Sequence, residues 1–234
     1  MPYSVSDSPP KLSPTVEDYV KAIYLLHQAF GKVTTTHLAE HLGFAPPSVT
    51  SMLQKLAKLN LVIYTPYHGA VLTAVGQHLA LEVLRHHRLV ELFLVEALGY
   101  SWEEVHTEAE VLEHVLSERL EARIDAHLGH PTVDPHGDPI PFLDGTLPEL
   151  PCQPLTHLPL ESPARIVRVT DQNPSHLRNL AELRLIPGVV ITVRARAPFD
   201  GPLSVGVGDA LHPLDIRLAR TIFVEAGAAK EAAI

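Results

Sequence analysis

The chain has a single cysteine, Cys152, and no apolar run that approaches the roughly 20 residues of a membrane span. One cysteine excludes a disulfide framework and a cluster of thiolate ligands. The N-terminal stretch MPYSVSDSPPKLSP is polar and proline-rich, so it lacks the apolar core of a signal peptide. No nucleophile elbow, phosphate loop or HExxH motif occurs. These absences predict a soluble cytoplasmic protein without a membrane partner, and they argue against common enzyme classes.

Positive charge is also scarce, because 18 lysines and arginines stand against 27 acids, giving a formal net charge of −9. Taken alone, this balance argues against a nucleic-acid partner. The distribution is uneven, however, since residues 31–74 carry Lys32, Lys55 and Lys58 against Glu40 alone. The chain also has 15 histidines, and histidine is the commonest metal ligand among side chains.

The first part of the chain has the pattern of a winged helix-turn-helix. A helix follows Ser13 and ends at Gly31, a short second helix stops at Gly43, and a third begins near Pro46. Two strand-like pieces, LVIYTP and GAVLTA, are joined by a turn at YHG. Helices followed by a hairpin in this order predict a DNA-binding domain over residues 1–75.

The third helix would then lie in the major groove of DNA. The side chains predicted to contact DNA are Ser48, Thr50, Ser51, Lys55 and Lys58 on this helix, and Tyr67 and His68 on the wing. The lysines would contact phosphates and position the protein. Because the helix lacks arginine, shape readout and thymine methyl contacts would carry more of the specificity than guanine readout. The alternative is a helix cap made by Ser48 and lysines that are simply solvated.

The rest of the chain divides by its pattern. Residues 76–145 are predicted to form a helical domain, and the stretch TAVGQHLALEVLRHHRLVELFLVEALG, residues 73–99, is its long first helix. Prolines then become dense, and residues 146–162 are predicted to be a proline-rich linker. Residues 163–234 show the short strands ARIVRVT, VVITVRAR and LSVGV, which predict a small β-barrel. The expected fold class is mainly α with a small β domain.

The stretch HTEAEVLEHVLSERL, residues 106–120, reads as one helix. Four of its polar side chains share an arc of roughly 100°, namely His106, Glu110, Glu113 and His114. An ordinary amphipathic surface helix would look the same. Its apolar side, with Leu112 and Leu116, is a candidate dimer surface.

Two other predicted helices carry similar groups. One has His87 and Glu91 four residues apart on one face, and the first helix has Asp18 near its start. Helix bundles build metal sites by projecting such groups inward from facing helices. Besides a metal-dependent DNA-binding protein, three alternatives stay open: a di-metal hydrolase or oxidase, a metal-independent transcription factor with solvated acids, and a metal-delivery or storage protein.

The sequence resembles the metal-dependent transcriptional regulators of the diphtheria toxin repressor and manganese transport regulator type. The resemblance runs through nearly the whole chain and rests on VEDYVKAIYLL, PPSVTSMLQKLAKLNLVIY, RHHRLVELFL, VHTEAEVLEHVLS, DPHGDPIP and LRNLAELRLIPGVVITV. It implies a winged helix-turn-helix, a helical dimerisation and metal-binding domain and an SH3-like domain. It also implies a homodimeric regulator without catalytic residues, which binds a palindromic operator in double-stranded DNA when it holds a divalent metal ion.

The resemblance further implies a set of metal ligands. It places a primary site at Asp18, Glu110, Glu113 and His114. It places a second site at His87, Glu91 and His106. A residue of the SH3-like domain near His176 would complete the second site, with Asp171 and Asn173 as further candidates.

Two positions depart from the family's iron-sensing and manganese-sensing patterns. Iron-sensing members carry methionine and cysteine where this chain has Asp18 and Glu110, and carboxylates in place of sulfur favour Mn²⁺. Fe²⁺ is the competing ion, and other divalent transition metals are expected to bind in vitro. Lys21 stands where the manganese type carries an acid, so we expect a manganese-type primary site beside an iron-type second site. Without metal the carboxylates would repel one another, and an ion would clamp the first helix to the bundle.

Overall fold

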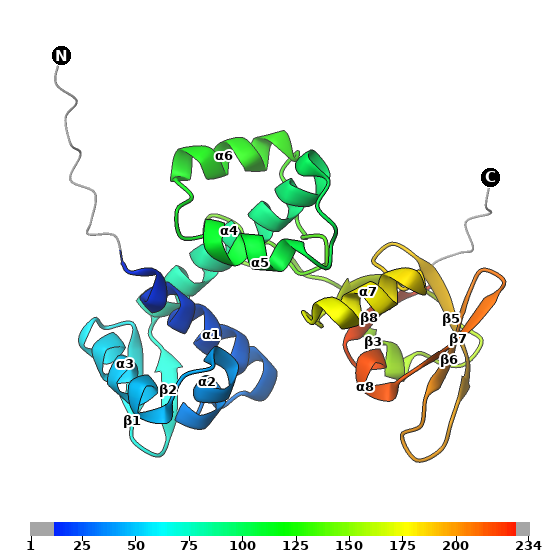
Figure 1. The fold of residues 1–234 in the computed structure, drawn as a ribbon, viewed down its shortest axis with the longest axis horizontal. Coiled ribbons are helices and arrows are strands. Elements are labelled where there is room, and N and C mark those ends of the chain that lie inside the picture. Colours follow the sequence, from blue (N-terminus) through cyan, green and yellow to red (C-terminus); the bar gives the residue numbers. More distant parts are fainter. Residues whose placement is uncertain (1–11, 228–234) are drawn as a thin grey trace. The chain divides into compact units, whose positions relative to one another are not determined.

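The computed structural model describes residues 12–227 and divides into two compact units, one ending at Arg85 and the other beginning at His86 (Figure 1). Among the described residues, no helix is both long enough and apolar enough to cross a membrane. The predicted class is confirmed, because helices make up most of the first unit and the start of the second, and a small antiparallel sheet follows.

The first unit is the expected winged helix-turn-helix. Its elements are α1 (Pro14–Phe30), α2 (Thr35–Leu42), α3 (Pro46–Lys58), β1 (Val62–Thr65), β2 (Gly69–Leu72) and the first half of α4 (Ala74–Leu98). Gly31 ends α1 with a φ of 71°, and Thr34 caps α2 by accepting a hydrogen bond from the His37 amide at 3.1 Å. Ser13 occupies the cap position of α1, but its side chain makes no cap hydrogen bond. Apolar side chains of all these elements form one core.

The wing is an antiparallel hairpin of β1 and β2, in which Ile63 faces Val71 across the strands. Gly69 closes the hairpin with a φ of 103°, and a Cβ there would lie 2.2 Å from the carbonyl oxygen of Val33. Only glycine permits this approach, which ties the wing to the segment between α1 and α2.

The predicted single helix over residues 106–120 is wrong. Helix α5 spans Val105–Leu112, a turn follows, and α6 spans Glu118–His127. The side chain of Ser117 accepts a hydrogen bond from the Leu120 amide at 3.3 Å and so starts a new helix. The break also divides the predicted dimer surface, since Leu116 is buried within the helical core and only Leu112 stays partly exposed.

The C-terminal domain is a six-stranded antiparallel sheet in the order β3-β8-β4-β5-β6-β7 (Figure 1). Its elements are β3 (Gln153–Pro154), the 3₁₀ turn η1 (Leu155–His157), β4 (Pro163–Val169), α7 (Pro174–Glu182), β5 (Val190–Arg196), β6 (Leu203–Val207), β7 (Ala210–Leu214), α8 (Ile216–Ala219) and β8 (Ile222–Ala226). The domain begins inside the range predicted as a linker. Leu155 and Leu158 are fully buried in its core, so apolar burial fixes this part of the proline-rich segment.

Within the second unit, the DPHGDPIP turn lies against β4. Gly137 has a φ of 81°, and a Cβ there would lie 1.9 Å from the carbonyl oxygen of Val167. The amide of Val169 donates to the carbonyl of His136 at 2.8 Å, and Arg168 pairs with Asp138 at 2.5 Å. These contacts fix the position of a turn that carries buried polar side chains.

Candidate metal centre and nucleic-acid interface

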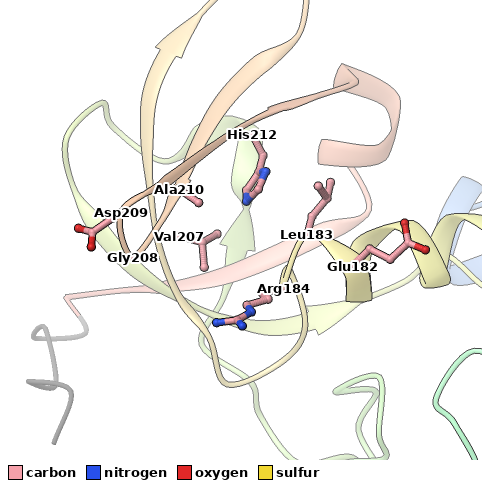
Figure 2. A pocket seen from close by; sticks show the side chains of 8 residues that line it. All are labelled: Glu182, Leu183, Arg184, Val207, Gly208, Asp209, Ala210 and His212. Carbon is pink, nitrogen blue, oxygen red and sulfur yellow. The ribbon is translucent and has the colours of Figure 1, made fainter.

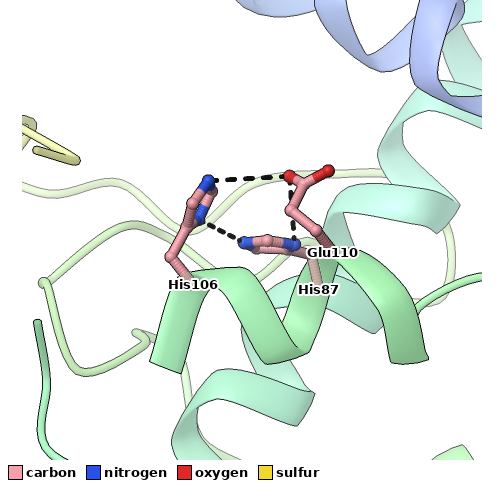
Figure 3. A group of neighbouring side chains, drawn as sticks. All are labelled: His87, His106 and Glu110. Carbon is pink, nitrogen blue, oxygen red and sulfur yellow. Dashed lines mark hydrogen bonds and ion pairs between the residues drawn. The ribbon is translucent and has the colours of Figure 1, made fainter. Parts of the chain in front are cut away.

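His87, on α4, lies at the centre of the predicted ligands (Figure 3). Its Nδ1 is 2.5 Å from Glu113 Oε2 and 3.7 Å from Glu110 Oε1, and its Nε2 is 3.0 Å from Glu91 Oε1. His106 is next to it, with Nδ1 3.1 Å from His87 Nε2 and Nε2 3.7 Å from Glu110 Oε1. The two predicted sites are therefore contiguous, because His87 of one set contacts Glu110 and Glu113 of the other.

Glu91 is almost completely buried and lies among three imidazoles. Its Oε1 is 3.0 Å from His87 Nε2 and 3.2 Å from His106 Nδ1, and its Oε2 is 3.8 Å from His136 Nδ1. Burial alone would raise the pKa of Glu91, but the charge of His87 and the neighbouring imidazoles hold that pKa well below its ordinary value. The group is therefore expected to be a carboxylate near neutral pH.

The sequence interpretation missed two buried groups of the DPHGDPIP turn, Asp134 and His136. The ligand atoms of Glu91, Asp134 and His136 lie within 4.8 Å of one another. Burial, together with the charges of Asp138 and Glu91, raises the pKa of Asp134 to about 8. The only available signal was the histidine between two aspartates in a proline-rich segment.

His136 is held in one orientation. Its Nε2 donates to the carbonyl of Trp102 at 2.8 Å, and its ring stacks on the Trp102 indole. Its Nδ1 is buried without a hydrogen-bond partner and is directed at Glu91. Burial lowers the pKa of His136, but the carboxylates of Glu91 and Asp134 outweigh burial and raise it to about 8.

Glu113 and His114 lie on the turn between α5 and α6, where His114 Nε2 is 3.5 Å from Glu113 Oε1. His86 holds this turn in place, since its Nδ1 donates to the Glu113 carbonyl at 3.3 Å and its Nε2 pairs with Glu121 of α6 at 3.2 Å. Asp18, the remaining predicted ligand of the primary set, is half-buried on α1 in the first unit. Its membership of that set stays a prediction.

His176 is not brought to this cluster. It is exposed on α7, and its Nδ1 pairs with Asp171 Oδ2 at 2.9 Å. Asn173 caps α7 through hydrogen bonds from the amides of Ser175 and His176. The candidates that the resemblance placed in the SH3-like domain thus serve their own helix end.

The donor set of the second unit fits a divalent transition metal. It consists of imidazole nitrogens and carboxylate oxygens, and the ligand atoms of His87, His106 and Glu110 lie within 4.8 Å of one another. The expected repulsion between carboxylates is not what the structure shows in this unit. Histidines lie between the acids, so Glu91 and Glu113 each have an imidazole as partner.

The predicted DNA-contacting residues lie together in the first unit. Ser48, Ser51, Lys55 and Lys58 are exposed on α3, and Tyr67 is fully exposed at the tip of the wing beside His68. The Thr50 hydroxyl donates to the Pro46 carbonyl at 3.0 Å and keeps its lone pairs to accept from a donor such as water. Ala45 occupies the cap position of α3, so the alternative role of Ser48 as the helix cap is wrong.

Three family models match the chain. Residues 11–70 match the N-terminal DNA-binding domain of iron-dependent repressors, and residues 73–142 match their metal-binding and dimerisation domain. Residues 153–226 match the FeoA domain. The matches leave only short connecting and terminal segments outside.

Individual proteins give the same result. The chain is 32% identical over 227 residues to the iron-dependent repressor IdeR of Mycobacterium tuberculosis, covering 92% of this chain and 98% of that protein. It is 38% identical over 105 residues to the regulator MntR of Bacillus subtilis, covering 45% of this chain and 73% of that protein. Among solved structures, a manganese-dependent transcriptional repressor in complex with manganese has a TM-score of 0.84 and 40% identity, covering 90% of this chain and 99% of that chain.

Proposed function

The chain belongs to the family of iron- and manganese-dependent repressors, and on that premise we propose that it is a Mn²⁺-responsive regulator of metal-ion homeostasis. The family consists of metal-dependent DNA-binding repressors with a dimerisation domain, and not of enzymes. Beyond what holds for the family, we propose that this chain responds to Mn²⁺, forms a homodimer, binds a palindromic operator and works in the cytoplasm, where that DNA lies.

The observation that carries the proposal is the convergence around His87. Imidazole and carboxylate donors from α4, α5 and the turn after α5 meet there, and most of them are buried. Burying so many ionisable groups is costly unless they are paired or hold a cation. A bound divalent ion would supply the positive charge that satisfies the carboxylates.

The proposed metal preference rests on the oxygen content of the primary set. Asp18, Glu110 and Glu113 offer carboxylates, His114 offers one imidazole, and no sulfur ligand belongs to the set. Such hard donors suit Mn²⁺. An Fe²⁺-responsive regulator is the second candidate, because His87, Glu91 and His106 keep the iron-type second set and the relative IdeR is named iron-dependent.

A homodimer is supported by apolar side chains on the surface of α5, α6 and the turn between them. Val111 and Val115 are 67% and 69% exposed, and Leu120 is 49% exposed. Together with Leu112 they form a candidate dimer surface without Leu116. A dimer would present two α3 helices roughly 34–36 Å apart, or at a multiple of that spacing, to matching operator half-sites.

The test is a DNA titration of the full chain with and without Mn²⁺, using genomic fragments enriched by the Mn²⁺-loaded protein. Wild-type protein should bind the fragments only with the ion, and Glu113→Ala should bind weakly in both conditions. The matched control is Glu108→Ala, which removes an exposed carboxylate from α5, the helix directly before Glu113, and it should behave as wild type. Equal affinity of all three proteins with and without the ion would refute the proposal.

A second measurement separates the two metals. Anaerobic equilibrium dialysis against Mn²⁺ and Fe²⁺ at controlled free concentrations gives the affinity for each ion, and the DNA titration is repeated with each. DNA binding restored by Fe²⁺ but not by Mn²⁺ would favour the second candidate. No bound ion of either kind would favour a metal-independent transcription factor.

A further inference from the structure

A cavity of about 360 Å³ lies in the C-terminal domain, between the end of α7 and the β6–β7 hairpin (Figure 2). None of its lining residues belongs to the predicted metal or DNA sites. Leu183, Val207 and Ala210 supply apolar surface, and Arg184 and His212 supply hydrogen-bond donors. Its volume lies near the lower end of the range for small-molecule sites, roughly 300–1,000 Å³.

Arg184 occupies a position where glycine is the usual residue. It has a φ of 57° directly after the C-cap of α7, and its amide donates to the Ala181 carbonyl at 2.9 Å. The next amide, Leu185, donates to the Leu180 carbonyl at 2.8 Å, which completes a Schellman motif. A side chain in the left-handed region is strained, so this arginine is kept at a cost to the backbone.

The two basic side chains of the cavity have no polar partner within the described part of the chain. Neither the Arg184 guanidinium nor the His212 ring makes a hydrogen bond or ion pair with any residue between 12 and 227. Figure 2 shows both directed into the space beside Val207, whereas Glu182 and Asp209 carry their carboxylates at its outer sides. The acids thus lie at the outer sides, and the exposed Arg184 and the half-buried His212 offer donors next to apolar surface.

We propose that this cavity binds a small organic carboxylate with an apolar body. The carboxylate would accept hydrogen bonds from the Arg184 guanidinium, whose fork of N–H groups matches two carboxylate oxygens, and from the His212 ring. The apolar body would lie against Leu183 and Val207. A singly charged group suits the site better than phosphate, since one arginine faces two rim carboxylates.

Such a ligand would give the regulator a second chemical input besides metal. The proposal does not depend on the metal assignment, because the cavity lies wholly in the C-terminal domain and shares no residue with the metal set. The strained backbone of Arg184 also allows a test by substitution with glycine, which should weaken ligand binding and at the same time relieve the backbone strain.

The experiment is a titration of the full chain with hexanoate, benzoate and 3-phenylpropionate, followed by amide chemical shifts in NMR spectra. We expect saturable shifts at Arg184 and Gly208, and weaker ones with benzamide, which is uncharged. Arg184→Gly should weaken carboxylate binding at least tenfold, while its melting temperature stays equal or rises because glycine relieves the strain. Arg217→Ala, which removes an exposed arginine of the same domain outside the cavity, should bind as wild type.

Three results would overturn the proposal. These are the absence of saturable shifts with all three carboxylates, equal binding by the Arg184→Gly variant, and tighter binding of inorganic phosphate than of the carboxylates. His212→Gln gives an independent check, since it keeps a donor of similar size and should weaken binding less than Arg184→Gly does.

Discussion

Raising the pH from 6.5 to 8 should destabilise the metal-free protein through Asp134 and His136. Asp134 has its pKa raised from 3.8 to about 8, chiefly by burial, and His136 has its pKa raised from 6.5 to about 8 by Glu91 and Asp134. Both groups bind a proton more tightly in the folded state than in the unfolded state. Their stabilising contribution is therefore complete below the unfolded pKa and is lost as the pH rises through the folded pKa.

The size of the effect follows from these pKa values by proton linkage. Between pH 6.5 and pH 8, Asp134 loses about 2 kcal/mol and His136 about 1 kcal/mol of stabilisation, with one pKa unit worth about 1.4 kcal/mol. The two losses are not independent, because the charge of Asp134 is one cause of the raised pKa of His136. Together they amount to roughly 2–3 kcal/mol, a large part of the roughly 5–15 kcal/mol by which a domain is stable. Glu91 contributes nothing in this window, because its pKa is lowered and it is ionised in both states.

The assay is urea unfolding with a chelator present, at pH 6.5 and pH 8. Asp134→Asn removes the titrating group and keeps an oxygen that can accept from the amides of His136 and Asp138. It should lose more than half of the pH-dependent change. The other histidines contribute equally to the pH-dependent change in wild type and variant, so their contribution cancels in the difference between the two proteins.

The matched control is Asp144→Asn. Asp144 sits in a similar turn, where its Oδ1 accepts from the Thr146 amide at 2.8 Å, but it is exposed. Hydrogen bonds from Thr146 lower its pKa, so it titrates far below the window and its variant should match wild type. A wild-type stability that is flat or rises between the two pH values, or equal behaviour of the two variants, would refute the reasoning.

Four substitutions give further expected outcomes. Ser117→Ala removes the cap of α6 and should lower the free energy of unfolding by about 1 kcal/mol in urea titrations. Gly137→Ala adds a Cβ where backbone and space forbid it, and should cost at least about 2 kcal/mol, measured in the same way. Glu110→Cys should raise the affinity for Zn²⁺ and Cd²⁺ relative to Mn²⁺ in competition dialysis, because sulfur is the softer ligand. His176→Ala should leave the number of bound ions unchanged, because the structure pairs this residue with Asp171.

The periodic elements were predictable from the sequence, and one helix boundary was not. Apolar spacing and punctuation by Gly31 and Gly43 were enough for α1 to α3. The period continues through the turn at Glu113, so spacing alone could not reveal the break there. The deciding signal was the capping residue Ser117, which lies four residues after Glu113 and inside a stretch that reads as helical.

The two missed ligand candidates lie in a turn, where the spacing of residues along the sequence does not predict which side chains meet. Asp134 and His136 reach Glu91 only because the DPHGDPIP turn folds back against β4, an approach that depends on Gly137 and its contact with Val167. A proline-rich segment has no periodic pattern from which this fold-back against β4 could be predicted. The structure pairs His176 with Asp171 at its own helix end, and its role as a metal ligand stays a prediction that spacing could not decide either.

Sharing of Glu91 makes the candidate metal-ligand groups of the second unit interdependent. Its Oε1 contacts His87 and His106, and its Oε2 faces His136. An ion bound by His87 and His106 would draw negative charge from the Glu91 carboxylate. Glu91 would then stabilise the proton on His136 less strongly. Since that negative charge helps to raise the pKa of His136, metal binding should release protons near neutral pH even where no ligand has to deprotonate. Proton release and metal affinity are therefore linked through one buried carboxylate, and the affinity should rise with pH over the same interval in which the metal-free protein loses stability.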